Sequence, residues 1–392
     1  MALIRILATK PNGAAYHGHI ATPYIEKVNR MADRPNVVIT TNEESRAMTI
    51  GDGDLERLRA IADVRFEQFD ALSSWDEAPP DDADVNRRFI EVARDADIAI
   101  ISHGAPRITP EIMDALPKLR FIGELEGDRF ARRIDLEAAW ERGVKTVDTT
   151  NGSSYGVSEW ALTLAMLGLR EGGRLFRNII VDRKAEFHED WEQSAGYRRG
   201  ELTGKTVGMI GAGHIGRRFL ELLKPFDCPT FVHDPYVPRE LADIYDVTFT
   251  TLDNVLSRSD VIVCLAPITP ATRGMLGARE FALMQDDAVF VNVSRGAIVQ
   301  SDALIAEVQA ERITACLDVF DPEPIPVDSP IRDLPNVFLT PHIAGYQRKD
   351  YWRFFTLMVD ELERFLDGHE TRYDLLPHTQ ADRTGASPTT RG

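Results

Sequence analysis

Three charged side chains follow three successive apolar segments of the sequence, and their chemistries complement one another. Arg295 follows VFVNVS, Glu323 follows CLDVF and His342 follows VFLTP. An arginine can clamp a carboxylate with a fixed fork of donors and polarise an adjacent carbonyl. A histidine can give or take a proton near neutral pH, and a carboxylate beside it fixes its tautomer and favours the proton donor. Hydride reduction of a small anionic 2-keto acid to its 2-hydroxy acid needs these three parts.

Each of these residues also has an ordinary structural explanation. Taken alone, Arg295 would form a loop ion pair, Glu323 would be solvated in a proline-rich loop, and His342 would be a capped loop histidine. In open parallel α/β sheets, however, ligands bind beyond the carboxyl ends of the strands. The three apolar segments read as strands of one such sheet, so the side chains should converge on one edge. We therefore favour the catalytic interpretation.

Upstream of these residues, the stretch TVGMIGAGHIG predicts a dinucleotide site. Gly211 permits a tight turn, Gly213 lets the backbone approach a pyrophosphate, and Gly216 lets the following helix pack closely on the strand. The helix N-terminus offers unpaired N–H groups to the phosphates. Asp234 lies 18 residues after Gly216, where an acid can accept the ribose hydroxyls of NAD and would repel the 2′-phosphate of NADP. The predicted cofactor is NAD; the alternative is a glycine-rich turn in another βαβ unit.

Apolar runs and helical periodicities alternate along the chain and predict two successive parallel α/β units. The first unit includes strands at 2–8, 37–40, 64–69, 98–101, 121–122 and 144–147. The glycine stretch opens the second, with later strands at 261–266, 288–293, 314–319 and 337–339. A largely apolar helix at 157–170 connects them. The predicted fold is two Rossmann-like, doubly wound parallel-sheet domains.

Composition excludes some partners. The formal net charge is −17, which argues against nucleic acid and against an anionic membrane surface. Cys228, Cys264 and Cys316 are far apart and sit in or beside apolar runs, so no metal site is predicted and a reducing, cytoplasmic setting is expected. The N-terminal sequence MALIRILATK lacks a signal-peptide pattern, and the apolar run at 160–169 is too short to span a bilayer.

The sequence resembles the D-isomer-specific 2-hydroxyacid dehydrogenase family. The matching stretches are TVGMIGAGHIG, CLAPITPATRGML, VFVNVSRGAIV, CLDVFDPEP and VFLTPHIAG, in the order found in the family. The resemblance implies Arg295 as substrate anchor, His342 as acid/base and Glu323 as the partner of His342. It also implies cofactor contacts at Gly211, Gly213, His214, Ile215, Gly216, Asp234, Ala266, Pro267, Ser294 and Asp318, with Asp318 near the nicotinamide carboxamide.

The resemblance implies a domain arrangement as well. Residues 1–152 and 343–375 would form a discontinuous substrate domain, and residues 153–342 an inserted NAD-binding domain. Members that resemble this chain are usually homodimers with the helix after Ser154 near the interface, and their substrate is a D-2-hydroxy acid. We expect the tail, residues 376–392, to be disordered and no regulatory domain to follow.

One loop departs from the family pattern. Members of the family often have G-x-G-x-D-N-I-D after the strand that ends FIG, and its backbone N–H groups meet the substrate carboxylate. This chain has a longer loop, ELEGDRFARRID, in which the resemblance implies Gly127 as a substrate contact through its N–H. Arg129 either meets a second anionic group or, with Arg132 and Arg133, is a surface charge; we favour the surface charge. The family's other substrate loop would correspond to His103 and Gly104.

Two other functions are compatible with parts of this pattern. Formate dehydrogenases resemble this chain but carry a glutamine where Glu323 stands, so they rank low. An NAD(H) sensor or corepressor can keep this fold and even these three residues. Turnover separates the sensor from the enzyme, because a sensor binds NADH but converts 2-keto acids negligibly.

Overall fold

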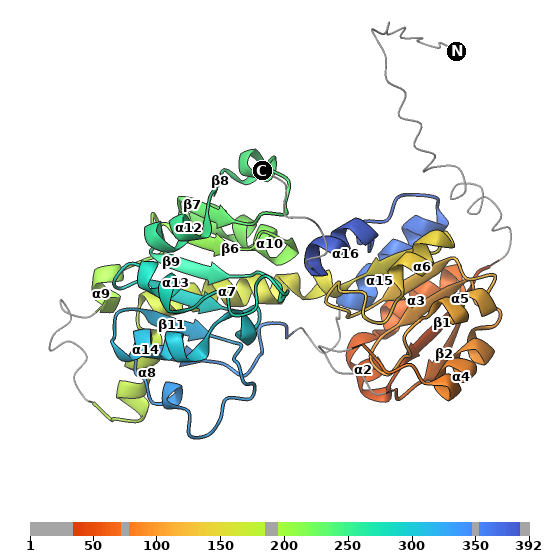
Figure 1. Ribbon diagram of the computed structural model, residues 1–392, viewed down its shortest axis with the longest axis horizontal. Coiled ribbons are helices and arrows are strands. Elements are labelled where there is room, and N and C mark those ends of the chain that lie inside the picture. Colours follow the sequence, from red (N-terminus) through yellow and green to blue (C-terminus); the bar gives the residue numbers. More distant parts are fainter. Residues whose placement is uncertain (1–33, 72–77, 185–194, 347–352, 385–392) are drawn as a thin grey trace, which may run out of the picture.

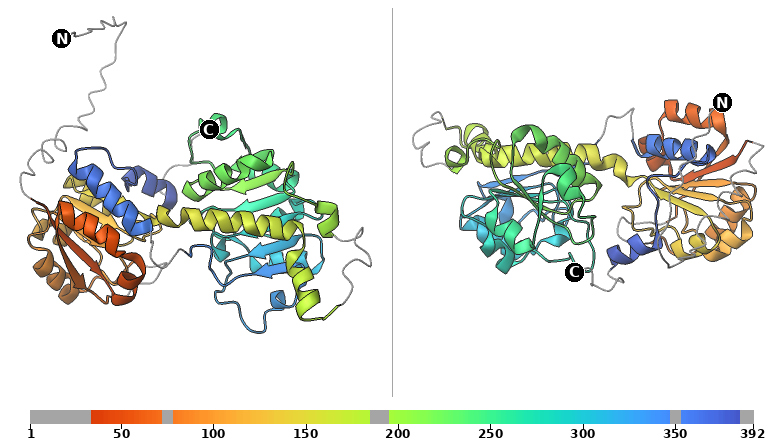
Figure 2. Two further views of the ribbon diagram at one scale, coloured as in Figure 1. Left: turned by 180° about the vertical axis from the view of Figure 1, so that it is seen from behind. Right: turned by 90° about the horizontal axis from the view of Figure 1, so that it is seen from above.

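A computed structural model describes residues 34–71, 78–184, 195–346 and 353–384. It contains two parallel α/β units joined by the long helix α7 (Ser154–Leu169), as Figures 1 and 2 show. The predicted fold class is confirmed. The strand expected at residues 2–8 lies outside the described residues.

The first unit is built on a five-stranded sheet in which every neighbouring pair is parallel. Its strand order is β2-β1-β3-β4-β5. The strands are β1 (Asn36–Thr41), β2 (Asp63–Gln68), β3 (Ile98–Ile101), β4 (Phe121–Glu124) and β5 (Lys145–Asp148). The helices are α2 (Glu43–Thr49), α3 (Asp52–Ile61), α4 (Ala83–Ala93), α5 (Pro110–Ala115) and α6 (Leu136–Glu141). All residues of β3 and β4 are buried, as expected for a parallel sheet covered on both faces.

The chain returns to this first sheet near its C-terminus. Helix α15 (Arg353–Leu366) buries Phe354, Phe355, Met358 and Val359 in one core with residues of β1, β3 and β4. This supports the expected discontinuity of the first domain. The tail was expected to be disordered, and this was wrong for its first part: Pro377–Thr384 form helix α16, which packs beside α6. Residues 385–392 lie outside the described residues.

The second unit is a seven-stranded parallel sheet in the order β12-β11-β10-β9-β6-β7-β8. Its strands are β6 (Val207–Ile210), β7 (Thr230–His233), β8 (Thr248–Phe249), β9 (Val261–Cys264), β10 (Val289–Asn292), β11 (Thr314–Leu317) and β12 (Val337–Leu339). Its helices include α10 (His214–Leu223), α11 (Leu241–Tyr245), α12 (Leu252–Arg258), α13 (Ala278–Leu283) and α14 (Ser301–Gln309). The order reverses between β6 and β9. A doubly wound sheet binds its ligand at such a reversal.

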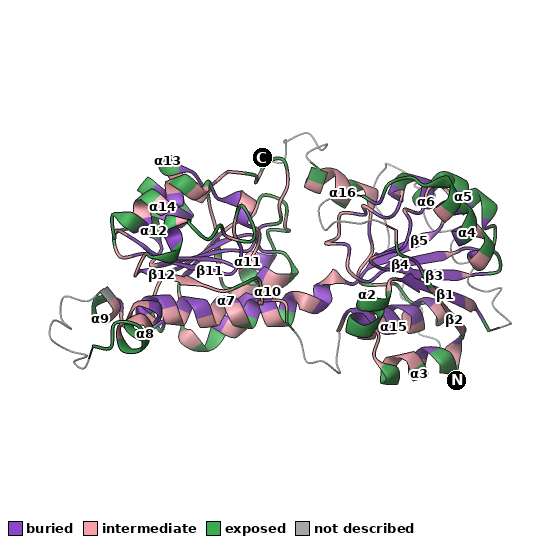
Figure 3. Ribbon diagram, turned by 90° about the horizontal axis from the view of Figure 1, so that it is seen from below, coloured by how far each residue is buried: buried purple, intermediate pink, exposed green. Residues whose placement is uncertain are grey.

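Helix α7 belongs to the second unit by its packing. Its buried residues Val157, Ala161, Leu164 and Ala165 join the core of the seven-stranded sheet. Figure 3 shows the central strands of both sheets buried and α7 buried on one side only. Helix α8 (Gly172–Ile180) follows and is apolar on an exposed face. Within the described residues, no helix is both long and apolar enough to cross a membrane.

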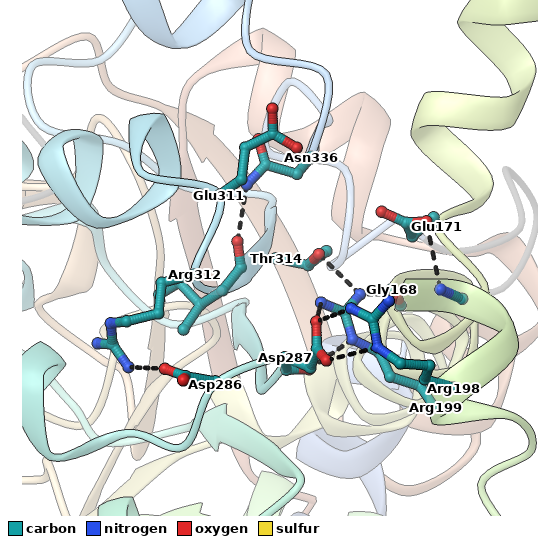
Figure 4. Close-up of polar contacts among 12 residues, drawn as sticks. Gly168, Glu171, Arg198, Arg199, Asp286, Asp287, Glu311, Arg312, Thr314 and Asn336 are labelled. Carbon is teal, nitrogen blue, oxygen red and sulfur yellow. Dashed lines mark hydrogen bonds and ion pairs between the residues drawn. The ribbon is translucent and has the colours of Figure 1, made fainter. Parts of the chain in front are cut away.

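A buried arginine ties helix α9 (Ala195–Arg199) to the N-terminal ends of strands β10 and β11. The Arg199 guanidinium donates to Thr314 Oγ1 at 2.8 Å, to Gly168 O at 3.3 Å and to Asp287 O. The neighbouring Arg198 pairs with the Asp287 carboxylate at 2.8 Å. Figure 4 shows both arginines directed at Asp287, which precedes β10. The end of α7, the loop before β10 and the start of β11 are thereby held together.

Candidate active site

The glycine turn after β6 has the geometry that its sequence predicts. Gly211 has φ +100°, and a Cβ there would lie 2.7 Å from Ala266 N, which follows the strand across the reversal. A Cβ on Gly216 would lie 2.7 Å from Gly211 O, so this glycine lets α10 approach the turn. A Cβ on Gly213 would meet nothing within 4 Å. The space beside Gly213 is therefore open to a ligand.

The groups around this turn suit a dinucleotide. Gly213 is the N-cap of α10 and supplies no side-chain cap, so the first N–H groups of the helix, beginning with His214 and Ile215, have no capping side chain. Asp234 Oδ2 accepts from Ala212 N at 2.8 Å, which places the carboxylate beside the turn. Ala266 follows β9 and accepts a hydrogen bond from Ser294 Oγ. These contacts bring the ends of β6, β7, β9 and β10 together.

His214 is neutral at physiological pH. Burial, followed by the positive charges of Arg129, Arg217 and Arg383, lowers the pKa of its imidazole to about 3. Its ring lies 6.0 Å from that of Tyr373, which belongs to the segment after α15. The N-terminus of α10 therefore faces the first unit, across the space between the two sheets. Ile215 packs at the edge of the second core, and the exposed Pro267 follows Ala266.

His342 and Glu323 form the predicted pair. His342 Nδ1 lies 2.6 Å from Glu323 Oε1, and the two side chains are 45% and 36% exposed. Because the carboxylate accepts from Nδ1–H, Nε2 is the nitrogen left for a reactant. The residues come from the loop after β11 and the loop after β12, which are neighbouring strands. His342 has φ 53°.

Asp318 holds the loop of His342. Its carboxylate is fully buried and accepts from Thr340 Oγ1 at 2.5 Å, Ile343 N at 3.0 Å and Ala344 N at 2.9 Å. Its carbonyl accepts from His342 N at 2.9 Å. Both carboxylate oxygens are therefore occupied within the protein. These hydrogen bonds hold the loop that carries His342, and the nicotinamide contact expected for Asp318 stays a prediction.

Arg295 lies after β10 and reaches across to the first unit. Its Nη1 donates to Ser294 O at 2.8 Å and its Nη2 to Asp128 Oδ2 at 2.6 Å. Gly296 permits this path, since a Cβ there would lie 1.7 Å from Phe320 O. Sequence reasoning missed Asp128, whose only signal was its place in the loop that departs from the family pattern.

The amides of that loop already have partners. Gly127 N and Asp128 N donate to Thr150 Oγ1 at 3.0 and 2.9 Å, and Arg129 N donates to Asp148 Oδ2 at 2.8 Å. Gly127 was expected to offer its N–H to the substrate. In this structure that N–H donates to Thr150 Oγ1 instead. A ligand between the units would therefore meet side chains of the loop and not its amides.

The loop arginines are structural. We expected surface charges, and this was wrong: Arg133 is buried and donates to Glu124 Oε1 at 2.9 Å and to His103 Nδ1 at 2.8 Å. Arg129 donates to the carbonyls of Asp148 and Asp374, each at 2.9 Å. The two thus fasten the loop to its own domain. The helical periodicity used for prediction carries no information about such a loop.

His103 lies at the start of the loop after β3 and is a neutral acceptor. Burial, and then the charge of Arg133, lowers the pKa of its ring to about 4. Its carbonyl accepts from Asn42 N at 2.7 Å. Gly104 is needed for packing, because it has φ +92° and its Cβ would lie 2.1 Å from Phe69 O.

Two carboxyl groups of the loop are buried among these charges. Burial is the largest cause that raises the pKa of Glu124, and Asp148 adds to it while Arg133 opposes it. Burial, then the charge of Asp128, raises the pKa of Glu126 to about 8, again against Arg133. Among the described residues, no group of three or more His, Cys, Asp or Glu side chains could hold a metal ion.

Comparison with known proteins identifies the family to which these site residues belong. The model of the "D-isomer specific 2-hydroxyacid dehydrogenase, NAD binding domain" matches residues 174–344, which contain the glycine turn, Arg295, Glu323 and His342. These residues therefore form an NAD-binding domain.

Relatives and solved structures agree. The D-3-phosphoglycerate dehydrogenase of Methanocaldococcus jannaschii is 31% identical over 281 residues, covering 71% of this chain and 51% of that protein. The Bacillus subtilis protein named "Putative 2-hydroxyacid dehydrogenase YoaD" is 33% identical over 243 residues, covering 61% of this chain and 68% of that protein. A phosphoglycerate oxidoreductase from Rhizobium etli shares the fold, with a TM-score of 0.71 and 24% identity over 87% of this chain and 98% of that one. The chain spans about half the length of the phosphoglycerate dehydrogenases that it matches. It belongs to the D-isomer specific 2-hydroxyacid dehydrogenase family.

Proposed function

We propose that this protein is an NAD-dependent oxidoreductase that interconverts a small 2-keto acid and its D-2-hydroxy acid. The observation that carries the proposal is the His342–Glu323 pair at 2.6 Å, on the same sheet as the glycine turn and Arg295. A proton donor, its orienting carboxylate and an anion anchor thus follow the adjacent strands β12, β11 and β10.

His342 acts as the acid/base. Glu323 accepts from Nδ1–H, which fixes the tautomer and directs Nε2 to the substrate oxygen. In reduction, Nε2–H gives its proton to the oxygen on C2; in oxidation, Nε2 takes it back. Asp318 supports this role because it binds the backbone on both sides of the ring.

Arg295 binds the substrate carboxylate. Its side chain is one-third exposed (33%), so we expect part of its donor fork to be accessible to a ligand. A planar fork holds a carboxylate in a fixed orientation beside the carbonyl that reacts. Because the guanidinium and the substrate carboxylate carry opposite charges, their hydrogen bonds are stronger than those between neutral groups.

The residues around the glycine turn fit NAD. The open space beside Gly213 admits the pyrophosphate, the first amides of α10 (at His214 and Ile215) can donate to it, and Asp234 can accept the ribose hydroxyls. Ala266 and Pro267 would pack against the adenosine, and Ser294 would border the nicotinamide. When bound, the cofactor supplies or accepts the hydride.

The domain assignment follows from these roles. We assign residues 1–152 and 343–375 to the substrate domain and 153–342 to the NAD-binding domain. The packing of α15 on the first sheet and of α7 on the second supports it.

The decisive experiment is NADH oxidation against a panel of 2-keto acids: glyoxylate, hydroxypyruvate, pyruvate, phenylpyruvate and phosphohydroxypyruvate. At least one acid should be reduced, and His342→Ala should lower kcat by about 10²–10⁴-fold. His369→Ala is the control, because His369 is an exposed histidine in the loop after α15 and should leave kcat unchanged. NADH binding without turnover of any acid would contradict the proposal and favour a sensor.

A further inference from the structure

The arginine assigned to the substrate carboxylate already has a carboxylate beside it. Arg295 Nη2 lies 2.6 Å from Asp128 Oδ2, and the two side chains are 33% and 19% exposed. The pair joins the loop after β4 in the first unit to the end of β10 in the second. A substrate bound by Arg295 would therefore lie within contact distance of a fixed negative charge.

Asp128 is held where it is by its backbone. Its N–H donates to Thr150 Oγ1 at 2.9 Å and its carbonyl accepts from Arg383 Nη1 at 3.2 Å. Its φ of 52° lies in the left-handed region. These contacts fix the backbone of Asp128, and the ion pair with Arg295 holds its carboxylate, whose side chain is 19% exposed.

The rest of the loop adds acceptors to this place. Glu126 is two residues away, its side chain is 17% exposed, and its carboxylate feels the charges of both Asp128 and Arg295. The backbone amides of Gly127, Asp128 and Arg129 already donate to the side chains of Thr150 and Asp148. Across the described part of the chain, no residue donates a hydrogen bond to Asp128 Oδ1. Because Glu126, with a pKa of about 8, is mainly protonated near neutral pH, the negative charge that the loop offers a ligand here is that of Asp128, whose Oδ1 can accept a hydrogen bond.

We propose that Asp128 sets the substrate class: a 2-keto acid with a single negative charge whose C3 carries a hydroxyl or ammonium donor. Arg295 binds the carboxylate, and Asp128 Oδ1 accepts from the donor on C3. A phosphate or a second carboxylate at that position meets Asp128 as a like charge and is rejected. The inference rests on the proposed function and deepens it.

Three substrates that differ only at C3 test this inference: hydroxypyruvate, pyruvate and 3-phosphohydroxypyruvate, each with NADH and the full chain. For the wild type, kcat/KM for hydroxypyruvate should exceed that for pyruvate by at least about tenfold, because the hydroxyl completes a polar pair. It should exceed that for 3-phosphohydroxypyruvate by about 100-fold or more, mostly through KM.

The variant Asp128→Asn removes the charge and keeps the shape, and asparagine tolerates the left-handed backbone. It should lower the preference for hydroxypyruvate over 3-phosphohydroxypyruvate by at least about tenfold. Asp128→Gly, which also accepts a positive φ, should do the same if the first variant folds poorly. Asp114→Asn is the matched control: Asp114 forms an exposed pair with Arg142 at 2.8 Å on the outer helices, so the preference should not change.

The outcomes are distinct. Wild-type protein that reduces the phosphorylated acid as efficiently as hydroxypyruvate overturns the inference, and so does an unchanged preference in both Asp128 variants; in either case the proposed function stands. Failure of all three acids and of the wider panel contradicts the proposed function, and the inference then falls with it.

Discussion

Glu126, in the loop after β4, couples the stability of the protein to pH. Its folded pKa, about 8, lies above the ordinary value of 4.5, chiefly because of burial. A carboxyl whose pKa is raised by folding stabilises the native state fully below pH 4.5, and that contribution is lost as the pH rises toward 8. The protein should therefore lose stability over this range through Glu126.

Glu126→Gln removes that titration and keeps the shape of the side chain. The variant should melt near the wild-type temperature at pH 5 and above it at pH 9, as thermal unfolding followed by circular dichroism would show. Glu137→Gln, on the exposed face of α6, is the control and should not change the pH dependence. Equal differences in melting temperature at both pH values would mean that Glu126 is ionised in the folded protein.

The unit of β6, its glycine turn and α10 behaves as one element in which the three glycines have different tasks. Gly213→Val should leave folding intact, because no atom lies within 4 Å of the added Cβ. It should weaken NADH binding by at least about tenfold, since the branched side chain fills the space assigned to the pyrophosphate. Fluorescence titration of NADH measures the affinity, and a thermal melt measures the fold.

Gly211→Val is the matched comparison for this element. Its φ of +100° and its 2.7 Å approach to Ala266 N predict a lower melting temperature as well as lost binding. Full NADH affinity in Gly213→Val would show that the pyrophosphate lies elsewhere.

The buried side chain of Arg199 ties helix α9 to the sheet. Arg199→Leu leaves Thr314 Oγ1 and the carbonyls of Gly168 and Asp287 without their guanidinium donors, and should lower the free energy of unfolding by about 1–3 kcal/mol. Arg198→Leu loses a half-exposed ion pair with Asp287 and should cost about 0–1 kcal/mol. Urea unfolding measures the free energy of unfolding of both variants. An equal decrease in the two would contradict the assignment of Arg199 as the residue that holds α9 to the sheet.

At the scale of the whole molecule, the sequence predicted what periodicity and strand ends encode. The alternating apolar runs predicted both sheets, and residues at strand ends such as Arg295 and His342 could be assigned because parallel strands bring those ends to one edge. The positions of Asp128 and Arg133 could not be predicted. Asp128 is set by an ion pair with Arg295 from the other unit, and Arg133 by contacts with Glu124 and His103, and neither follows from the local sequence pattern. The helix at Pro377–Thr384 was missed because its stability comes from tertiary contacts, including Gln380 to Phe130 O, and not from an apolar face.

The assembly of the whole molecule should rest on helix α8. The exposed apolar residues on it and directly after it are Leu175 (44%), Phe176 (61%), Ile179 (46%), Ile180 (58%) and Val181 (68%). A contiguous apolar face of this kind on a chain with a net charge of −17 marks a contact surface. We infer that a second copy of the chain covers it, as the family resemblance suggests for the neighbouring helix α7.

Phe176→Glu tests this assembly, because a two-fold interface would bury the new charge twice. Light scattering on a sizing column should give the mass of two chains for the wild type and of one chain for the variant. Met48→Glu, an exposed apolar position on α2 at 41% exposure, should remain at two chains. A wild type with the mass of one chain would contradict the homodimer, and a variant still at two chains would move the interface away from α8.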